Sequence, residues 1–343
     1  MKSADPKRPS INPRQLLRQQ GSVGLSRLLA TTGYMVQRQL LSDAEQAIMS
    51  CMPHLIEGPR GGGKTAMAEA LAEACNLPLF YLQGMEDLNL DDVLFSWDKT
   101  GQAAFVANAL KSGMPLREAM AAQWSEDYLI LGEVLAAYDL ASRTGVVPIL
   151  VVDEADKLKP KIEDMLLQVF ARGYASIPRF GDVGVMNDRE LWPVVLLLSN
   201  DIRHDLSAPT RSRCIYSWLD LPTPAESVAI LSSRVPKAPA SWVATVARIL
   251  DCVIDIQGVV DKPALREGIS LLDALVRDGV DAIDEPTMDK YLCHLAKRHN
   301  DRDYLRLSLG RLSYAANTSN PELDILVDDY FAARARSQMR VAA

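Results

Sequence analysis

Residues 58–65, GPRGGGKT, gather four glycines, a lysine and a threonine into one short segment. They fit the pattern G-x-x-x-x-G-K-[ST], in which glycines let successive backbone N–H groups surround phosphate oxygens. Lys64 can then reach the terminal phosphates, and the Thr65 hydroxyl can ligate Mg²⁺. An apolar run precedes the loop and the helix-forming run TAMAEALAEA follows it. An accidental glycine-rich turn is therefore the weaker interpretation.

This pattern predicts a nucleotide site, expected to bind ATP together with Mg²⁺. The helix that opens at Lys64 directs the positive end of its dipole toward the phosphates. The residues expected to contact the nucleotide in this segment are Gly58, Pro59, Arg60, Gly61, Gly62, Gly63, Lys64, Thr65 and Ala66.

A pair of carboxylates follows the apolar run ILVV. Asp153 and Glu154 stand at the end of this predicted strand, where two carboxylates are costly unless they serve a cation or a reaction. Asp153 suits the Mg²⁺ shell, and Glu154 suits a general base that activates the attacking water. This pairing is typical of a hydrolase. The alternative is an acidic cap of the next helix, which Asp156 can provide without the buried strand.

Asn200 ends a second apolar run, VVLLLS. A neutral amide on a strand beside Asp153 can orient the lytic water or sense the γ-phosphate. Asparagine at a strand end is also common turn chemistry. Its position after the loop and the acidic strand favours the catalytic role.

Two arginines, Arg211 and Arg213, lie in the segment APTRSRC just before a final predicted strand. One interpretation is a solvated basic turn. The other is an arginine finger, a cation that neutralises transition-state charge on the ATP of a neighbouring subunit. We favour the finger, with Arg213 ahead of Arg211. This role requires an oligomer whose active site lies at the subunit interface.

Five apolar runs predict strands that are covered on both faces, because their hydrophobicity is nearly continuous. They are HLIEG (54–58), LFYLQ (79–83), PILVVDE (148–154), VVLLLSN (194–200) and CIYSWLD (214–220). Helix-forming segments alternate with them, which predicts an α/β fold with a parallel five-stranded sheet and helices on both faces.

The chain is expected to comprise four regions. Residues 1–24 form a mobile basic arm, and residues 25–221 form the α/β nucleotide-binding domain. A change to helical texture after the proline-marked segment DLPTPAE predicts a small all-helical lid domain over residues 222–298. Residues 299–343 form a C-terminal helical extension.

Composition limits the function classes. The net charge of −7 gives no global basic field that would attract nucleic acid or an anionic membrane. The five cysteines are scattered without C-x-x-C spacing, which indicates a reducing compartment and no disulfide framework or metal site. The longest apolar runs are too short to span a bilayer, and the N-terminus lacks an apolar signal segment. We therefore expect a soluble, cytoplasmic protein without membrane insertion.

The order of these motifs resembles that of the AAA+ ATPases: phosphate loop, acidic strand, asparagine strand, SRC arginine and helical lid. More narrowly, it resembles the MoxR group. Residues 81–102 resemble that group's LQC-EGLD…EWNY–Q segment, and residues 196–222 resemble its LTSN-RELS…RRCLYHWIDYP segment. RVPKAP and KPALREGISLLDAL are similar to segments of its CoxD-like branch. The resemblance covers roughly residues 34–278.

This resemblance implies a P-loop NTPase of the AAA+ type that forms a ring, expected to be a hexamer, with Mg-ATP between subunits. It implies that Arg266, in the lid, is a second sensor arginine that reaches the γ-phosphate, although a surface helix charge is the alternative. Residues 98–147 are expected to hold the family's helical insert. Residues 176–185 are expected to form a hairpin toward the central pore, with Gly181 and Asp182 at its turn. A hairpin without a pore role is the alternative.

The resemblance further implies a remodelling chaperone that acts on a protein client in metalloenzyme or complex maturation. Its expected partner is a protein with a von Willebrand factor type A domain. A nucleic-acid-associated motor or loader is the alternative, because basic residues near both ends of the sequence could contact phosphates: Lys2, Lys7, Arg8, Arg14, Arg18, Arg334, Arg336 and Arg340. The acidic balance argues against it. A ring that binds ATP without hydrolysing it is a third possibility, which Lys64 and Glu154 disfavour.

Overall fold

The computed structural model describes residues 4–200 and 206–342. The chain divides into two compact units. The first comprises Met1–Thr32, Val36–Gly58 and Lys64–Leu219, and the second comprises Gly33–Met35, Pro59–Gly63 and Asp220–Ala343. The boundary expected after residue 221 lies two residues beyond this division. No helix in the described ranges is both long enough and apolar enough to cross a membrane.

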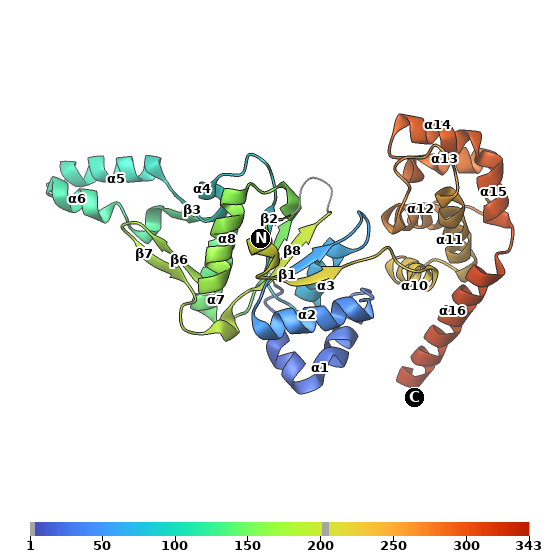
Figure 1. Cartoon of the computed structure of the whole chain (residues 1–343), viewed down its shortest axis with the longest axis horizontal. Helices are drawn as coiled ribbons and strands as arrows, with labels where there is room; N and C mark the ends of the chain where they lie inside the picture. The colour runs from blue at the N-terminus through green and yellow to red at the C-terminus, as the bar shows by residue number, and fades with distance from the viewer. Residues whose placement is uncertain (1–3, 201–205, 343) are drawn as a thin grey trace. The chain divides into compact units, whose positions relative to one another are not determined.

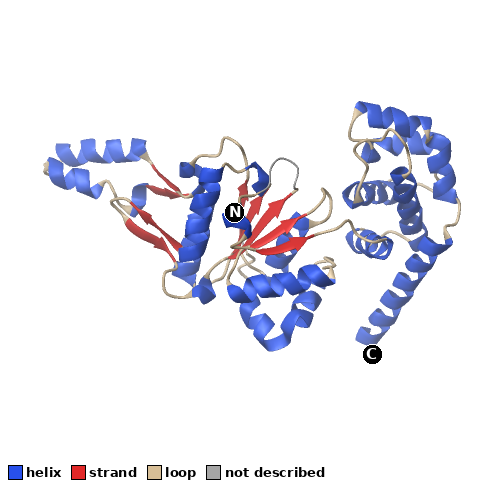
Figure 2. Cartoon of the chain, in the orientation of Figure 1, coloured by secondary structure: helices blue, strands red, loops and turns tan. Residues whose placement is uncertain are grey.

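The first unit is built on a five-stranded sheet with the order β2-β5-β8-β1-β9, in which every neighbouring pair is parallel (Figure 2). Its strands are β1 (His54–Glu57), β2 (Leu79–Gln83), β5 (Ile149–Asp153), β8 (Val194–Ser199) and β9 (Ile215–Trp218). The five predicted strands are thus confirmed. In β1, β5 and β8, nearly every residue is buried, which explains their continuous hydrophobicity.

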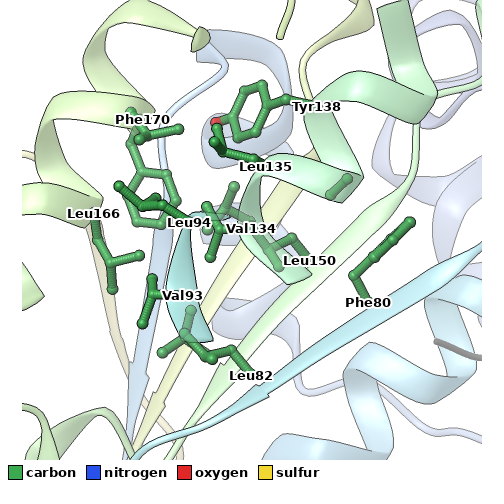
Figure 3. Close-up of a cluster of buried hydrophobic side chains, with 14 of the residues drawn as sticks. Phe80, Leu82, Val93, Leu94, Val134, Leu135, Tyr138, Leu150, Leu166 and Phe170 are labelled. Carbon is green, nitrogen blue, oxygen red and sulfur yellow. The ribbon is translucent and has the colours of Figure 1, made fainter. Parts of the chain in front are cut away.

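One face of this sheet is covered by α7 (Glu133–Thr144) and α8 (Pro160–Arg172), whose apolar side chains meet those of the strands. Figure 3 shows this contact, with Val134 and Leu135 of α7 close to Leu150 of β5. Val151, one residue along from Leu150, points to the opposite face and is also buried. There α3 (Lys64–Cys75) packs against β5 and β8. The sheet therefore carries helices on both faces, as predicted.

A helical insert lies between β2 and β5 in the first unit (Figure 1). It contains α4 (Leu90–Val93), β3 (Phe95–Trp97), α5 (Lys99–Lys111), α6 (Leu116–Ala122), the 3₁₀ helix η1 (Glu126–Tyr128) and β4 (Leu129–Leu131), and it leads into α7. Strands β3 and β4 pair antiparallel, and α5 contacts α6. The region expected to hold an insert, residues 98–147, is therefore mainly helical.

A β-hairpin follows α8 and consists of β6 (Tyr174–Ile177) and β7 (Gly181–Gly184). The prediction of a hairpin is confirmed, but the predicted turn is wrong. Gly181 and Asp182 belong to β7, and residues 178–180 make the turn, where Arg179 has a left-handed φ of 69°. The 3₁₀ helix η3 (Arg189–Leu191) then leads to β8.

The N-terminal region is packed rather than mobile. Residues 1–3 lie outside the described ranges, but α1 (Pro13–Ala30) and α2 (Arg38–Ser50) contact each other, and α1 also contacts α3. Arg14 is 1% exposed, and its guanidinium donates to the carbonyls of Ile48, Glu190 and Trp192. The basic composition that suggested an arm therefore includes a buried structural cation.

The second unit is helical, and its core continues into the C-terminal region. Thr223 and Glu226 form a capping box that starts the first helix of this unit. The helices are α10 (Pro224–Arg234), α11 (Ala240–Ile254), α12 (Leu265–Arg277), α13 (Glu285–Leu295), α14 (His299–Leu307), α15 (Leu309–Asn317) and α16 (Pro321–Ala342). Leu305, Leu312 and Val327 join the same buried cluster as residues of α10–α13. The helices after residue 298 therefore share one core with the helices of the predicted lid domain.

Candidate active site

The phosphate loop links β1 to α3 and has the backbone of an anion cradle. Gly58, Gly61 and Gly63 have φ values of 148°, 81° and 94°, a region that side chains with a Cβ rarely adopt. A Cβ on Gly58 would lie 2.2 Å from the carbonyl oxygen of Leu219. The glycines thus allow a backbone path that other residues would block.

Lys64 is the first residue of α3 and is buried. Its ammonium group donates to the carbonyl oxygen of Gly58 at 2.8 Å, which folds the side chain back along the loop. Ala66 follows in the first helical turn, and Arg60 is exposed on the loop. Each of these residues lies within the segment predicted to contact the nucleotide.

The acidic pair lies at the carboxyl end of β5. Asp153 is directly opposite Gln83 in the pairing of β5 with β2. Its Oδ2 atom is 3.4 Å from the hydroxyl of Thr65 and also accepts the hydroxyl of Tyr81. Hydroxyl and carboxylate oxygens are ligands that Mg²⁺ accepts, and the loop amides suit phosphate. The donor set present here therefore fits Mg-ATP, with Thr65 and Asp153 as the metal-side residues.

Glu154 follows in a left-handed conformation, with φ of 50°. Its carboxylate accepts the side-chain amide of Gln83 at 2.6 Å and the ammonium of Lys157. The backbone is crowded here, because a Cβ on Gly84 would lie 2.2 Å from the carbonyl oxygen of Glu154. A non-glycine residue at positive φ costs of order 1–3 kcal/mol and is typical of functional sites.

Tyr81 and Gln83 also contact the candidate site, although motif reasoning from the sequence did not single them out. Tyr81 and Gln83 are two positions apart on β2, so their side chains leave the same face of the strand. Tyr81 donates a hydrogen bond to the carboxylate of Asp153, and Gln83 donates one to the carboxylate of Glu154. Burial and the interaction with Asp153 raise the pKa of Tyr81 above its ordinary value, so its hydroxyl stays a donor. The parallel pairing of β2 with β5 was needed to identify them.

Asn200 directly follows β8, the strand beside β5. Its backbone N–H is 3.4 Å from the carboxylate of Asp156, which is buried. Asp156 thus contacts the backbone at the end of β8, and the side chain of Glu154 does not cap the 3₁₀ helix that follows it. The role of the Asn200 amide toward a lytic water remains a prediction.

The two arginines of the APTRSRC segment point to different environments. Arg211, the last residue of α9 (Ala208–Arg211), donates to both carboxylate oxygens of Glu57 at 3.3 and 3.2 Å. Arg213 is exposed, and its guanidinium donates to the carbonyl oxygen of Pro209 at 3.0 Å. Arg266 lies in the first turn of α12 in the second unit. Its role as a sensor stays a prediction.

The chain is similar to a known protein family and to several known proteins. Residues 53–214 match the family model described as an AAA domain of the dynein-related subfamily. The gas vesicle ATPase GvpN2 of Halobacterium salinarum is 24% identical over 246 residues, 69% of this chain and 64% of that protein. GvpN1 of the same organism is 25% identical, over 57% of this chain and 54% of GvpN1.

GvpN of Haloferax mediterranei is 27% identical over 192 residues, 53% of this chain. The chain thus spans between 50% and 64% of the length of these three relatives. The family match covers the phosphate loop, the acidic pair, Asn200 and both arginines. Residues 53–214 of this chain are therefore similar to an AAA domain of the dynein-related subfamily.

Proposed function

We propose that this chain hydrolyses Mg-ATP at the interfaces of a ring of identical subunits and uses the energy to remodel a protein client. The observation that carries the proposal is the exposed Arg213 in a chain that also holds a phosphate loop and an acidic pair. A cation that faces outward from its own site suits the ATP of a neighbour. Such a head-to-tail contact closes into a ring, for which we propose six subunits.

In this mechanism each group has a separate task. The loop amides and Lys64 bind the phosphates, while Thr65 and Asp153 would hold a Mg²⁺ ion, which would neutralise charge on the phosphates. The carboxylate of Glu154 first gives up its contacts with Gln83 and Lys157 and then accepts the proton of the attacking water. Asn200 orients that water. Arg213 of the adjacent subunit stabilises charge on the transferred phosphoryl group.

We assign the chain to the MoxR type, with its CoxD-like branch as the finer proposal, from the segments 81–102 and 196–222. This type suggests a partner with a von Willebrand factor type A domain and a role in the cytoplasm. The three relatives named above are gas vesicle ATPases, so a client in gas vesicle assembly is a second specific candidate beside a metalloenzyme.

The alternative of a nucleic-acid motor has less support than the sequence suggested. Arg8 donates to the carbonyls of Glu73 and Ala74, Arg14 is buried, and Arg18 pairs with Glu190 at 2.7 Å. Three of the basic side chains that could have contacted phosphates are therefore engaged within the chain.

Turnover of ATP by mixed subunits tests the proposal. Lys64→Ala subunits keep the finger but lose the phosphate contact, and Arg213→Ala subunits keep the ATP site but lose the finger. Each alone should be inactive, whereas a 1:1 mixture should regain turnover at about a quarter of its interfaces, where both intact parts meet. A mixture that stays inactive at every ratio contradicts the proposal.

The client is tested with Glu154→Gln, which should bind ATP but lose about 10²–10³-fold of turnover. The matched control is Asp164→Asn on the exposed side of α8. The trapped protein should retain a gas vesicle component or a von Willebrand-type partner only when ATP is present. Retention that disappears after nuclease treatment would favour the nucleic-acid alternative instead.

A further inference from the structure

The short helix α9 ends two residues before Arg213, the predicted finger, and is held by two buried glutamates from different elements of its own subunit. Glu57, the last residue of β1, is 2% exposed and receives both terminal nitrogens of Arg211. Glu163 on α8 is 3% exposed and accepts the hydroxyl of Thr210 at 2.8 Å and the backbone N–H of Ser207 at 3.0 Å.

These two glutamates belong to elements that flank the nucleotide site. Glu57 is bonded directly to Gly58, where the phosphate loop begins, and Lys64 donates to the Gly58 carbonyl. α8 follows the acidic pair after the 3₁₀ helix η2 (Ala155–Lys157). A change at either end of the nucleotide site therefore has a short route to α9.

The ion pair keeps Arg211 inside its own subunit. Withdrawing the guanidinium would break a hydrogen-bonded ion pair with a carboxylate that is buried, and breaking a buried ion pair is strongly unfavourable. Arg211 also donates through Nε to the carbonyl of Leu206 at 3.3 Å, so three of its donors are directed inward. These contacts disfavour Arg211 as a second finger.

Arg211 instead controls where Arg213 is presented. The backbone N–H of Arg213 donates to the Thr210 carbonyl at 3.1 Å, and its side chain donates to the Pro209 carbonyl. Arg213 is therefore held against the last turn of α9. Fixing Arg211 fixes this turn. A misplacement of about 1 Å at a catalytic group can cost 10²-fold in rate.

We propose that Glu57 and Arg211 form a positioning pair that links the base of a subunit's own phosphate loop to the finger that it offers to its neighbour. The pair makes the finger position of one subunit depend on its own loop. This inference rests on the proposed function, because it requires Arg213 to act across an interface.

The test places each substitution in one kind of subunit at a time. The reference is the mixture of Lys64→Ala subunits, which donate the finger, with Arg213→Ala subunits, which donate the ATP site. Arg211→Gln is then added to the finger donor only, or to the site donor only. Arg172→Gln, at an exposed arginine in the last turn of α8, is the matched control.

We expect Arg211→Gln in the finger donor to lower the rescued turnover at least about tenfold, and in the site donor by no more than about twofold. Equal losses in both placements would show a merely structural role and overturn the inference. Glu57→Gln in the finger donor should give the same loss, and combining it with Arg211→Gln should add nothing further.

Glu57→Gln also separates a positioning pair from a direct finger. If Arg211 touched the neighbour's ATP itself, Glu57→Gln would release it and leave rescue intact, which contradicts the inference. The double variant, which replaces the buried ion pair by two neutral amides, keeps the test valid if Arg211→Gln alone does not fold. An inactive reference mixture would instead overturn the proposed trans-acting site, and this inference with it.

Discussion

His54 is a buried histidine whose tautomer is fixed by a chain of hydrogen bonds. Its Nε2 atom lies 2.7 Å from the Ser217 hydroxyl, which donates to the carboxylate of Asp43 at 2.8 Å. Because the hydroxyl has only one proton and gives it to Asp43, Nε2–H must be the donor to Ser217. Burial lowers the pKa of His54 from 6.5 to about 4, although Asp43 opposes this shift.

This shift predicts a pH dependence of stability. Between pH 6.5 and about 4 the unfolded chain binds a proton at this histidine and the folded chain does not. The free energy of unfolding should therefore be highest above pH 6.5 and should fall with pH by up to roughly 3 kcal/mol from this group. Urea unfolding of wild type and His54→Gln should show a smaller loss in the variant.

The control is His299→Gln, because the His299 side chain is exposed. Its pH profile should match that of the wild type. A His54→Gln profile that loses stability as steeply as the wild type between pH 6.5 and 4 would show that His54 does not titrate as inferred.

Single residues also show what the sequence could and could not predict. Lys64, Thr65, Asp153 and Glu154 were predictable, because phosphate and metal chemistry require those residue types at local spacings. The partners of the acidic pair, Tyr81 and Gln83, were not, because their contacts arise from the register of β2 against β5, about 70 positions apart.

At the level of elements, α1 is anchored by Arg14. Its buried guanidinium joins the carbonyl at the end of α2 to two carbonyls before β8. A sequence rich in arginine and proline is typical of a mobile arm. Its composition does not show that the folded chain places three backbone carbonyls around the Arg14 guanidinium. This is why the predicted arm was wrong.

Arg14→Leu should lower the free energy of unfolding by roughly 2–4 kcal/mol, because three carbonyls lose their buried donor. Chemical denaturation followed by tryptophan fluorescence measures this loss. Arg18→Leu, which removes an exposed and solvent-screened ion pair with Glu190, should leave the free energy of unfolding nearly unchanged. Similar costs for the two variants would mean that the carbonyl contacts of Arg14 do not anchor α1.

The helical insert and the β6–β7 hairpin are joined by an aromatic cluster. Trp97 meets Trp124 edge to face at 5.0 Å between ring centroids, and it meets Phe180 of the hairpin turn at 6.1 Å. The Arg179 guanidinium lies 4.7 Å from the Trp124 ring centroid. The insert and the hairpin, which are separate in the sequence, are therefore in contact through these rings. The contact with Trp124 stabilises Arg179 in its left-handed conformation.

Trp124→Ala should loosen the hairpin turn, because it removes one aromatic pair and one cation–π contact, each worth about 0.5–1.5 kcal/mol. Amide hydrogen exchange in residues 174–184 should rise about tenfold if the lost free energy is about 1.4 kcal/mol. Phe105→Ala on α5, which removes the aromatic contact with Tyr128 of η1 instead, is the control and should leave exchange in the hairpin unchanged. An unchanged hairpin in both variants would show that the cluster does not hold it.

At the level of the molecule, each chain carries two different halves of the proposed reaction centre. The loop with its acidic pair and the exposed Arg213 lie within the residues that are similar to an AAA domain, yet α9 directs Arg211 inward and leaves Arg213 outward. The sequence predicted this fold class well, since continuous apolar strands and glycine punctuation are local signals. It could not assign the two arginines, because their difference depends on which one reaches Glu57.

Assembly should consequently depend on bound nucleotide. ATP in the loop of one subunit gives Arg213 of the next a negatively charged partner, so binding of ATP and association should strengthen each other. We expect Glu154→Gln with Mg-ATP to sediment as a discrete particle, about six times the mass of one chain if the ring is a hexamer. Without ATP the same protein should sediment as smaller species.

Two variants separate nucleotide-linked assembly from simple self-association. Lys64→Ala should stay small with or without ATP, because its loop lacks the phosphate contact, whereas Glu154→Gln/Arg213→Ala should bind ATP but assemble only at higher protein concentration. Analytical ultracentrifugation over a range of concentrations measures both effects. If Glu154→Gln sediments identically with and without ATP while it binds the nucleotide, the interface does not include the ATP site, and a trans-acting Arg213 is excluded.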